Sequence, residues 1–311
     1  MLEKNKKKSI KYWDKSAKSW KNKAYSPDGN FTIFPSSQIR NEIVIKDLIA
    51  SKNFSSRILD IGCADGRLIR DMLNAGFTQV MGIDNSAVMI DEAKKLLKLE
   101  FPELDADKIF FIADADKISI NNKFDYVTAI GLIEYVQDIN IFLSSVENLL
   151  DDNGSAYIES RNKLFNLVTA NDYTLNIDSP RELIEELDSI SHLSPIKGKD
   201  KEKLLLNTYQ YIGEHLNESN TNEPKEIKVF DKYPFDLPQY SPLELMQHCS
   251  FSNLLVDEVV YYHCHPFAPR FGEEFSQLFN QLGVLMQPIG YTNLGALICS
   301  AFVAKVKKSK N

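Results

Sequence analysis

The stretch Ile58-Leu59-Asp60-Ile61-Gly62-Cys63-Ala64-Asp65-Gly66 decides the fold of this chain. Its apolar start predicts a short strand over 57–61. Its glycines predict a tight turn, because glycine accepts positive φ and lets the backbone approach a ligand closely. The next residues, 66–74, predict a helix whose first N–H groups are unpaired and carry the positive dipole end, which suits a carboxylate or phosphate. The stretch therefore predicts a strand, a turn and a helix around an anionic ligand.

Outward from this unit, short apolar runs alternate with helical patterns. The further predicted strands are 79–83, 109–113, 126–130 and 155–159, and the further predicted helices are 87–98 and 139–150. The run Asp151-Asp152-Asn153-Gly154 predicts a turn before the last of these strands. Alternating strands and helices indicate a parallel sheet, and right-handed crossovers place the carboxyl ends of its strands at one edge. Ligands of such sheets bind at that edge.

After Asn162 the rhythm breaks, and it returns only with strand, helix and strand patterns at 254–263, 275–286 and 296–306. The intervening residues hold helical pieces and two polar stretches, 197–203 and 217–228, that are typical of exposed loops. We therefore expect a nucleotide-binding core formed by 51–162 and 251–311, with an inserted helical lid for the substrate at 163–250. Residues 1–50, with predicted helices at 10–23 and 38–49, are expected to cover the same sheet edge.

The composition is that of an ordinary globular protein, with 43% hydrophobic and 25% charged residues in 311. A formal net charge of -7 argues against nucleic acid as a partner, because phosphate binding needs clustered cations. One local exception is a basic cluster that we interpret as a solvated terminus, although it would also suit an anionic substrate or membrane. The cluster consists of Lys4, Lys6, Lys7, Lys8 and Lys11.

Neither a secretory signal nor a membrane span is expected, since no apolar segment of the required kind follows the lysines or occurs elsewhere. The four cysteines, Cys63, Cys249, Cys264 and Cys299, contain no CxxC pair. This pattern indicates reduced thiols in a cytoplasmic protein. The sequence does not indicate an oligomeric state.

Asp84 ends the next predicted strand about 20 residues after the turn, where a carboxylate can accept hydrogen bonds from both hydroxyls of a ribose. A dinucleotide site would instead be expected to show GxGxxG, and Ala64 stands where a second glycine would help. Taken alone, these features fit any ligand that contains adenosine.

The stretch from Ile58 to Gly66 resembles the first motif of the class I, Rossmann-like S-adenosylmethionine-dependent methyltransferases, hhDhGCGxG with h apolar, and departs from it only at Ala64. Three further stretches resemble later motifs of that family: 82–89, 113–115 and 130–136. The strands predicted near 259–263 and 300–305 resemble its sixth strand and its antiparallel seventh. The resemblance covers the core and not the insertion.

The resemblance implies an α/β fold with a seven-stranded, mostly parallel, doubly wound sheet and an antiparallel last strand, and it implies S-adenosylmethionine as cofactor. The N-terminal helices and the helical lid after the fifth strand would be added to this core. Asp60 and the loop backbone would hold the methionine part, Asp84 the ribose, and Asp114 the adenine amine. The full set of implied cofactor-binding residues is Asp60, Gly62, Cys63, Ala64, Gly66, Asp84, Asn85, Met89, Asp114, Ala115, Ile130 and Gly131. Helix capping by Asp60 and Asp114, and core packing of Met89, are the alternatives.

Methyl transfer requires an acceptor held in line with the activated methyl group and shielded from water. An acceptor hydroxyl also benefits from a general base. Glu134 follows the fourth predicted strand, and His263 and His265 end the sixth, so these three are the predicted catalytic residues. The alternatives are that Glu134 only fixes its loop and that the histidines are satisfied residues at the rim. Two imidazoles without a third ligand give little indication of a metal, and none is expected.

Polar and aromatic residues near the same edge are predicted to bind the substrate: Tyr135, Arg161, Asn162, Tyr173 and Tyr262. For Arg161 and Asn162, capping of the following helix is an equal alternative. The insertion is rich in tyrosines that either line a pocket or pack half-buried.

The sequence therefore predicts a small-molecule methyltransferase acting on oxygen or nitrogen. The stretches 162–166 and 171–174 resemble, more distantly, bacterial methyltransferases of sugars or surface-polysaccharide precursors, and a secondary-metabolite precursor is a related expectation. Methylation of a protein or tRNA, a cofactor-binding protein without catalysis, and an NAD-dependent oxidoreductase are the alternatives.

Overall fold

A seven-stranded sheet forms the centre of the computed structural model, which describes residues 8, 10–15, 34–167, 186–187, 189–216, 237–267 and 276–309. The strands follow the order β3-β2-β1-β4-β5-β7-β6. Their bounds are β1 Arg57–Ile61, β2 Gln79–Asp84, β3 Phe110–Ile112, β4 Phe124–Ala129, β5 Leu150–Arg161, β6 Leu254–Cys264 and β7 Cys299–Lys308. Neighbours among β1 to β5 pair in parallel, whereas β7 pairs antiparallel with both β5 and β6. The predicted sheet with its antiparallel last strand is thus confirmed.

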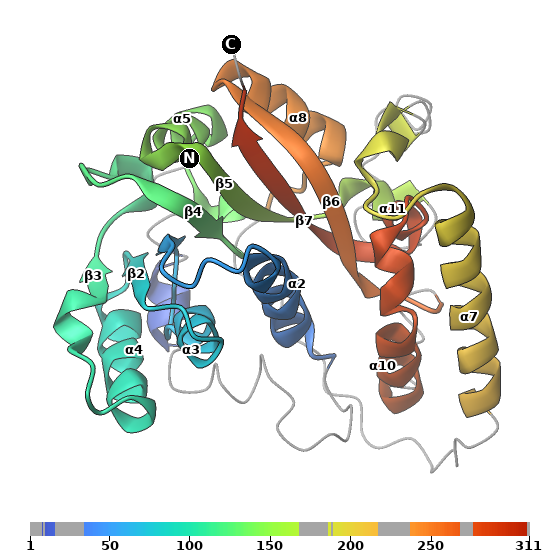
Figure 1. Cartoon of the computed structure of the whole chain (residues 1–311), viewed down its shortest axis with the longest axis horizontal. Coiled ribbons are helices and arrows are strands. Elements are labelled where there is room, and N and C mark those ends of the chain that lie inside the picture. Colours follow the sequence, from blue (N-terminus) through green and yellow to red (C-terminus); the bar gives the residue numbers. More distant parts are fainter. Residues whose placement is uncertain are drawn as a thin grey trace.

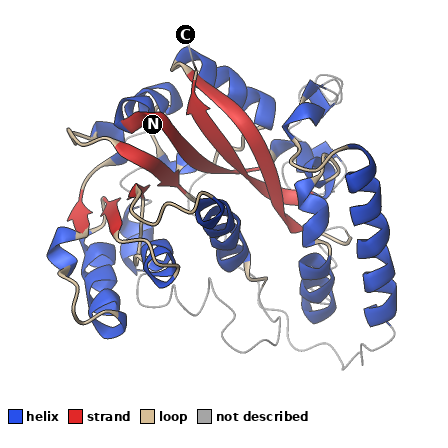
Figure 2. Ribbon diagram, viewed as in Figure 1, coloured by secondary structure: helices blue, strands red, loops and turns tan. Residues whose placement is uncertain are grey.

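Helices cover both faces of the sheet (Figures 1 and 2). One face packs against α2 (Ser36–Ala50), α3 (Arg67–Asn74) and α4 (Ala87–Glu100). The other packs against α5 (Ile139–Leu149) and α8 (Pro242–Phe251). Consecutive strand residues face opposite helices: Ile58 belongs to the cluster under α2, and Leu59 to the cluster under α5. The doubly wound arrangement follows from these apolar strands, which are buried on both faces.

The remaining helical elements include the described part of the predicted insertion. They are η1 Ala106–Lys108, η2 Ala115–Lys117, η3 Ile133–Tyr135, η4 Lys163–Leu167, η6 Ser191–Leu193, α7 Gly198–Leu216, α10 Ser276–Leu285, η7 Gln287–Tyr291 and α11 Gly295–Ile298. α7 lies near α10 and η7, beyond the β6 edge (Figure 1). Lys201 Nζ donates to Asn293 Oδ1 at 3.3 Å.

α8 was counted with the insertion in the predicted division of the chain, but its packing places it with the sheet. Its residues Leu245 and Cys249 are fully buried in the same hydrophobic cluster as Val146 of α5 and Val256 of β6. We therefore propose that the inserted segment ends before α8 rather than at residue 250.

Two local predictions need correction or restriction. Residues 151–154 lie within β5 instead of forming a turn, and the register between β4 and β5 shifts between Phe124 and Tyr126. Gly154 suits this place because a Cβ atom there would lie 3.0 Å from the Phe124 carbonyl oxygen. In the predicted helix 10–23, residues 10–15 are helical, and the rest falls outside the described residues. Among the described residues, no helix combines the length and hydropathy needed to cross a bilayer.

Candidate cofactor and methyl-transfer site

The turn after β1 has the backbone geometry of a ligand-binding loop. Gly62, Ala64 and Gly66 have φ values of 76°, 47° and 69°. The amides of Gly62 and Cys63 donate to the Ile83 carbonyl at 2.8 and 3.0 Å, which ties the turn to the end of β2. At Gly66 an added Cβ would lie 2.5 Å from Phe110 Cζ, so a residue without a side chain is required. The loop and the start of α3 thus meet at the carboxyl edge of β1 and β2.

Asp84 at the end of β2 organises this loop. Its Oδ2 accepts from the Ala64 amide at 3.0 Å, and its Oδ1 accepts from the Ser86 amide at 2.8 Å. Burial raises the pKa of Asp84, although these backbone hydrogen bonds oppose the shift. A carboxylate has about four lone-pair sites, so the two amides leave capacity for ribose hydroxyls.

Asp60 lies fully buried beside the loop. Its Oδ1 accepts from the Thr128 hydroxyl of β4 at 2.7 Å. Burial raises its pKa to about 7, and the negative charge of Asp84 adds to the shift. Asp60 therefore links β1 to β4 and does not cap a helix.

Arg40 of α2 also reaches this edge, and the sequence patterns had not indicated it. Its Nη1 lies 2.8 Å from the position that a Cβ of Gly131 would occupy, and Gly131 has φ 70°. The same nitrogen lies 3.5 Å from Glu159 Oε2 of β5. The loop after β4 therefore faces a guanidinium across a glycine.

The short helix at residues 10–15 lies across the same edge. Ser86 Oγ donates to Asp14 Oδ1 at 2.5 Å. The Trp13 ring meets the Tyr135 ring edge-on, with centroids 5.9 Å apart. This helix therefore joins the loop after β2 to the loop after β4, and a covering role for residues 1–50 stays a prediction.

Glu134 and Glu159 stand close together at the ends of β4 and β5. Glu134 is buried, and its Oε1 accepts from the Arg161 amide at 3.1 Å. Burial and the charge of Glu159 raise the pKa of Glu134 to about 7. A carboxyl group of this kind can exchange a proton near neutral pH.

His263 and His265 lie side by side at the end of β6, with ring centroids 4.6 Å apart. The His263 ring stacks on Phe34 at 4.2 Å, and its Nδ1 lies 3.0 Å from Ser300 Oγ. The backbone of His263 adopts a φ of 60°, a strained value for a residue with a side chain. Burial lowers the pKa of His263 to about 4 and that of His265 to about 2. Both imidazoles are therefore neutral and weakly basic, contrary to the near-neutral titration on which their predicted role as bases rested.

Comparison with known proteins places this geometry in a family. Residues 59–156 match the family described as a methyltransferase domain. The chain is 30% identical over 162 residues to the ubiquinone biosynthesis O-methyltransferase of Pelagibacter ubique, covering 50% of this chain and 65% of that protein. It is 24% identical over 267 residues to the protein of the same name from Glaesserella parasuis serovar 5, covering 84% and 89%. These matches support a class I methyltransferase. The alignment with the first of these relatives spans less than two thirds of its length.

A solved structure supports the fold of this chain. Magnesium protoporphyrin IX methyltransferase from Synechocystis PCC 6803, crystallised with bound SAH, superposes with a TM-score of 0.56 at 13% identity, covering 98% of this chain and 99% of that one. S-adenosylmethionine is the methyl donor of the family. The glycines of the β1 turn and the half-buried Asp84 carboxylate fit that cofactor.

The other predicted cofactor-binding residues lie in different places. The Cys63 side chain points into the sheet, since a Cβ on Gly82 would lie 2.9 Å from its sulfur, so only its backbone faces the loop. Met89 is 2% exposed and Asn85 is exposed. Asp114 caps η2, accepting from the Asp116 amide at 3.1 Å, and Ala115 begins that turn. Contact of these residues with adenine stays a prediction.

Two residues that were predicted to bind the substrate instead form hydrogen bonds within the protein, so the prediction needs correction for both. Asn162 is 1% exposed, and its amide donates to the carbonyls of Ala296 and Cys299 at 2.7 and 2.8 Å while accepting from Leu164 N at 3.1 Å. It therefore begins η4, which was the alternative. The Tyr262 hydroxyl is buried and donates to Glu159 Oε1 at 2.8 Å. Both side chains are buried in the protein interior and do not face a substrate.

Three substrate predictions remain open. Arg161 lies at the end of β5 beside Glu134, and Tyr135 lies under Trp13. Tyr173 falls outside the described residues.

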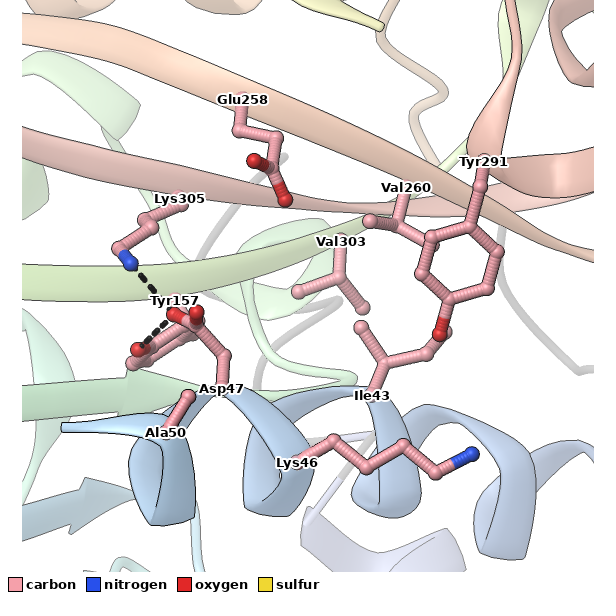
Figure 3. Close-up of a pocket in the computed structure, with 10 residues that line it drawn as sticks. All are labelled: Ile43, Lys46, Asp47, Ala50, Tyr157, Glu258, Val260, Tyr291, Val303 and Lys305. Carbon is pink, nitrogen blue, oxygen red and sulfur yellow. Dashed lines mark hydrogen bonds and ion pairs between the residues drawn. The ribbon is translucent and has the colours of Figure 1, made fainter. Parts of the chain in front are cut away.

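A cavity of about 260 Å³ lies away from this edge, between α2 and the middle of β5, β7 and β6 (Figure 3). Its charged groups largely neutralise one another: Asp47 accepts from the Tyr157 hydroxyl and pairs with Lys305 Nζ, each at 2.5 Å. Because the loop after β1 does not line it, this cavity is distinct from the candidate cofactor site.

Proposed function

We propose that this protein transfers a methyl group from S-adenosylmethionine to a hydroxyl oxygen of a small aromatic molecule. The observation that carries the proposal is the β1 turn, which contains three residues of positive φ and in which the Ala64 amide donates to the half-buried Asp84 at the carboxyl edge of the sheet. The oxygen acceptor is supported by relatives that are named O-methyltransferases of ubiquinone biosynthesis.

We assign different residues at the edge of the sheet to different parts of the cofactor. Asp84 would accept from the ribose hydroxyls, and the Gly62–Gly66 backbone and Gly131 would lie along the methionine part. Arg40, against Gly131, is the cation we assign to the methionine carboxylate, because a guanidinium presents a fork that matches a carboxylate. When bound, S-adenosylmethionine supplies a methyl group on a sulfonium that is already activated for transfer.

Glu134 is the group that we assign as general base. It lies in the loop that follows Gly131, and its pKa of about 7 suits removal of a hydroxyl proton at neutral pH. The pKa values of His263 and His265 are too low for that task. We place the histidines in the acceptor wall instead.

An aromatic acceptor is supported by the rings that gather at the end of β6. Phe165 lies 4.5 Å and Phe279 5.1 Å from the His265 ring, measured between centroids, and Phe34 stacks on His263. The three phenylalanines are buried, so we propose that an acceptor would contact this cluster at its rim, where apolar rings favour a flat aromatic ring over a sugar, which needs many hydrogen-bonding partners. A cytoplasmic location is part of this proposal and is supported by four cysteines that form no disulfide.

The test is a radiolabelled methyl-transfer assay with a catechol, a methyl glycoside, an alkylamine and a bulk tRNA fraction as acceptors. We expect label on the catechol alone, and a Glu134→Gln variant should lose about 10²–10⁴-fold in turnover. Label on the glycoside or amine alone would overturn the aromatic acceptor. Binding of S-adenosylhomocysteine without transfer to any acceptor would favour a cofactor-binding protein that has lost catalysis.

A further inference from the structure

Arg40 is held from the side opposite Gly131 by two buried side chains of the sheet. We propose that Glu159 and Tyr262 form a positioning pair, in which Tyr262 fixes the Glu159 carboxylate and Glu159 orients Arg40 toward the cofactor. The proposal rests on the assignment of Arg40 to the methionine carboxylate. It concerns residues that act through Arg40 and do not contact the cofactor themselves.

The geometry forms one connected chain across three elements. The Tyr262 hydroxyl on β6 donates to Glu159 Oε1 on β5 at 2.8 Å. The other carboxylate oxygen, Oε2, lies 3.5 Å from Arg40 Nη1 on α2. Glu159 is 4% exposed and Tyr262 is 3% exposed, so little water competes for these contacts. Each carboxylate oxygen thus has a different partner.

The sheet order makes the contact between Glu159 and Tyr262 depend on β7. β7 lies between their strands, with Val303 in register with Glu159 and Ala301 in register with Tyr262. Ala301 belongs to the cluster on the face of α2, as does Tyr262. A small residue at 301 lets the tyrosine reach across the strand.

Burial explains why Glu159 and Tyr262 hold the Arg40 side chain in one orientation. A buried carboxylate is costly unless hydrogen-bonded and paired, so Glu159 is strongly held where Tyr262 and Arg40 both reach it. The Arg40 side chain is 19% exposed and would otherwise have many rotamers on its long stem. Its Nη1 lies within 3 Å of the space above Gly131, so a small rotation would remove it from the loop.

The structure also contains a matched control in α2 and β5, the two elements that carry Arg40 and Glu159. Asp47 lies about two turns after Arg40 on α2. Its carboxylate accepts a hydrogen bond from the Tyr157 hydroxyl of β5 at 2.5 Å, in the cavity away from the cofactor edge. Tyr157→Phe removes a buried tyrosine hydroxyl from a carboxylate, as Tyr262→Phe does. Of the two contacts, only the one between Tyr262 and Glu159 is connected to Arg40.

The experiment compares two ligands on the full-length protein by calorimetry. S-adenosylhomocysteine carries the carboxylate, and 5′-methylthioadenosine lacks the whole amino-acid part. We expect Glu159→Gln to weaken S-adenosylhomocysteine binding about tenfold and Tyr262→Phe about threefold, which is the range for the net contribution of one ordinary hydrogen bond. Both variants should bind 5′-methylthioadenosine as the wild type does, and Tyr157→Phe should change neither affinity.

Kinetics give a second readout. The KM for S-adenosylmethionine should rise in both variants. In Tyr262→Phe, which keeps the Glu159 charge beside Glu134, kcat at saturation should stay near the wild-type value, which a general loss of structure would not produce. Equal weakening of both ligands, or no change for S-adenosylhomocysteine in Tyr262→Phe, would overturn the positioning role. If the wild type bound neither ligand, the proposed function itself would fail.

Discussion

Replacing Asp84 tests the cofactor site most directly, because two substitutions separate its two tasks. Asp84→Asn keeps one acceptor oxygen for the loop but removes the charge that would face the ribose. A hydrogen bond to a charged group is worth ~1.5–3 kcal/mol. We therefore expect S-adenosylhomocysteine to bind about 10- to 100-fold more weakly, while the unliganded protein stays folded.

Asp84→Ala removes the acceptors of both loop amides, Ala64 N at 3.0 Å and Ser86 N at 2.8 Å. Each buried donor left without a partner costs ~1–3 kcal/mol, so this variant should also unfold at lower denaturant concentration. Calorimetric titration and urea unfolding, run on both variants, measure the two effects. Asp105→Asn is the control, since Asp105 caps the remote η1 by accepting from the Asp107 amide. Wild-type affinity in Asp84→Asn would refute the assignment of Asp84 to the ribose.

Two further predictions concern stability. Ala64 has a φ of 47°, so Ala64→Gly should relieve left-handed strain and raise the free energy of unfolding by up to about 1 kcal/mol; a loss of stability in urea unfolding would show that the alanine is not strained. The pKa of Asp60 is raised from 3.8 to about 7, so the folded state holds this proton more tightly than the unfolded chain does. Stability from this group is present below about pH 4 and is lost as the pH rises toward 7, at ~1.4 kcal/mol per pKa unit. Unfolding at pH 5 and pH 7.5 should show this loss, and Asp60→Asn should reduce it; an equal slope in the variant would assign it to other groups.

The sheet was predictable from the sequence because its signals are local. The apolar runs and glycines around residues 57–66 report a strand and a turn without reference to distant residues. The prediction of a turn at 151–154 was wrong. The acidic residues and glycine of this run are typical of turns, but pairing with β4 extends the strand through them. Tertiary pairing overrode local turn propensity there.

The candidate site was predictable only where it follows a strand. Asp60 and Asp84 end parallel strands, so topology brings them together. Arg40 and Glu159 are 119 residues apart and belong to no motif, so nothing local indicated their contact. An arginine in the helical pattern and a glutamate in an apolar strand were the available signals, since buried charges are rare without partners. Asn162 and Tyr262 look like ligands in the sequence because polar side chains at strand ends serve the fold and the substrate equally well.

The position of β7 has a consequence for the order of assembly. β7 follows β6 along the chain but lies between β5 and β6 in the sheet. During synthesis, β6 emerges with no strand to pair with, and the edge of β5 stays open until residues 299–308 have left the ribosome. The contact between Tyr262 and Glu159 is therefore among the last to form, although neither residue belongs to β7. A chain interrupted before β7 would contain every residue assigned to the cofactor and still lack the pair that orients Arg40, and it would expose two unpaired strand edges to aggregation.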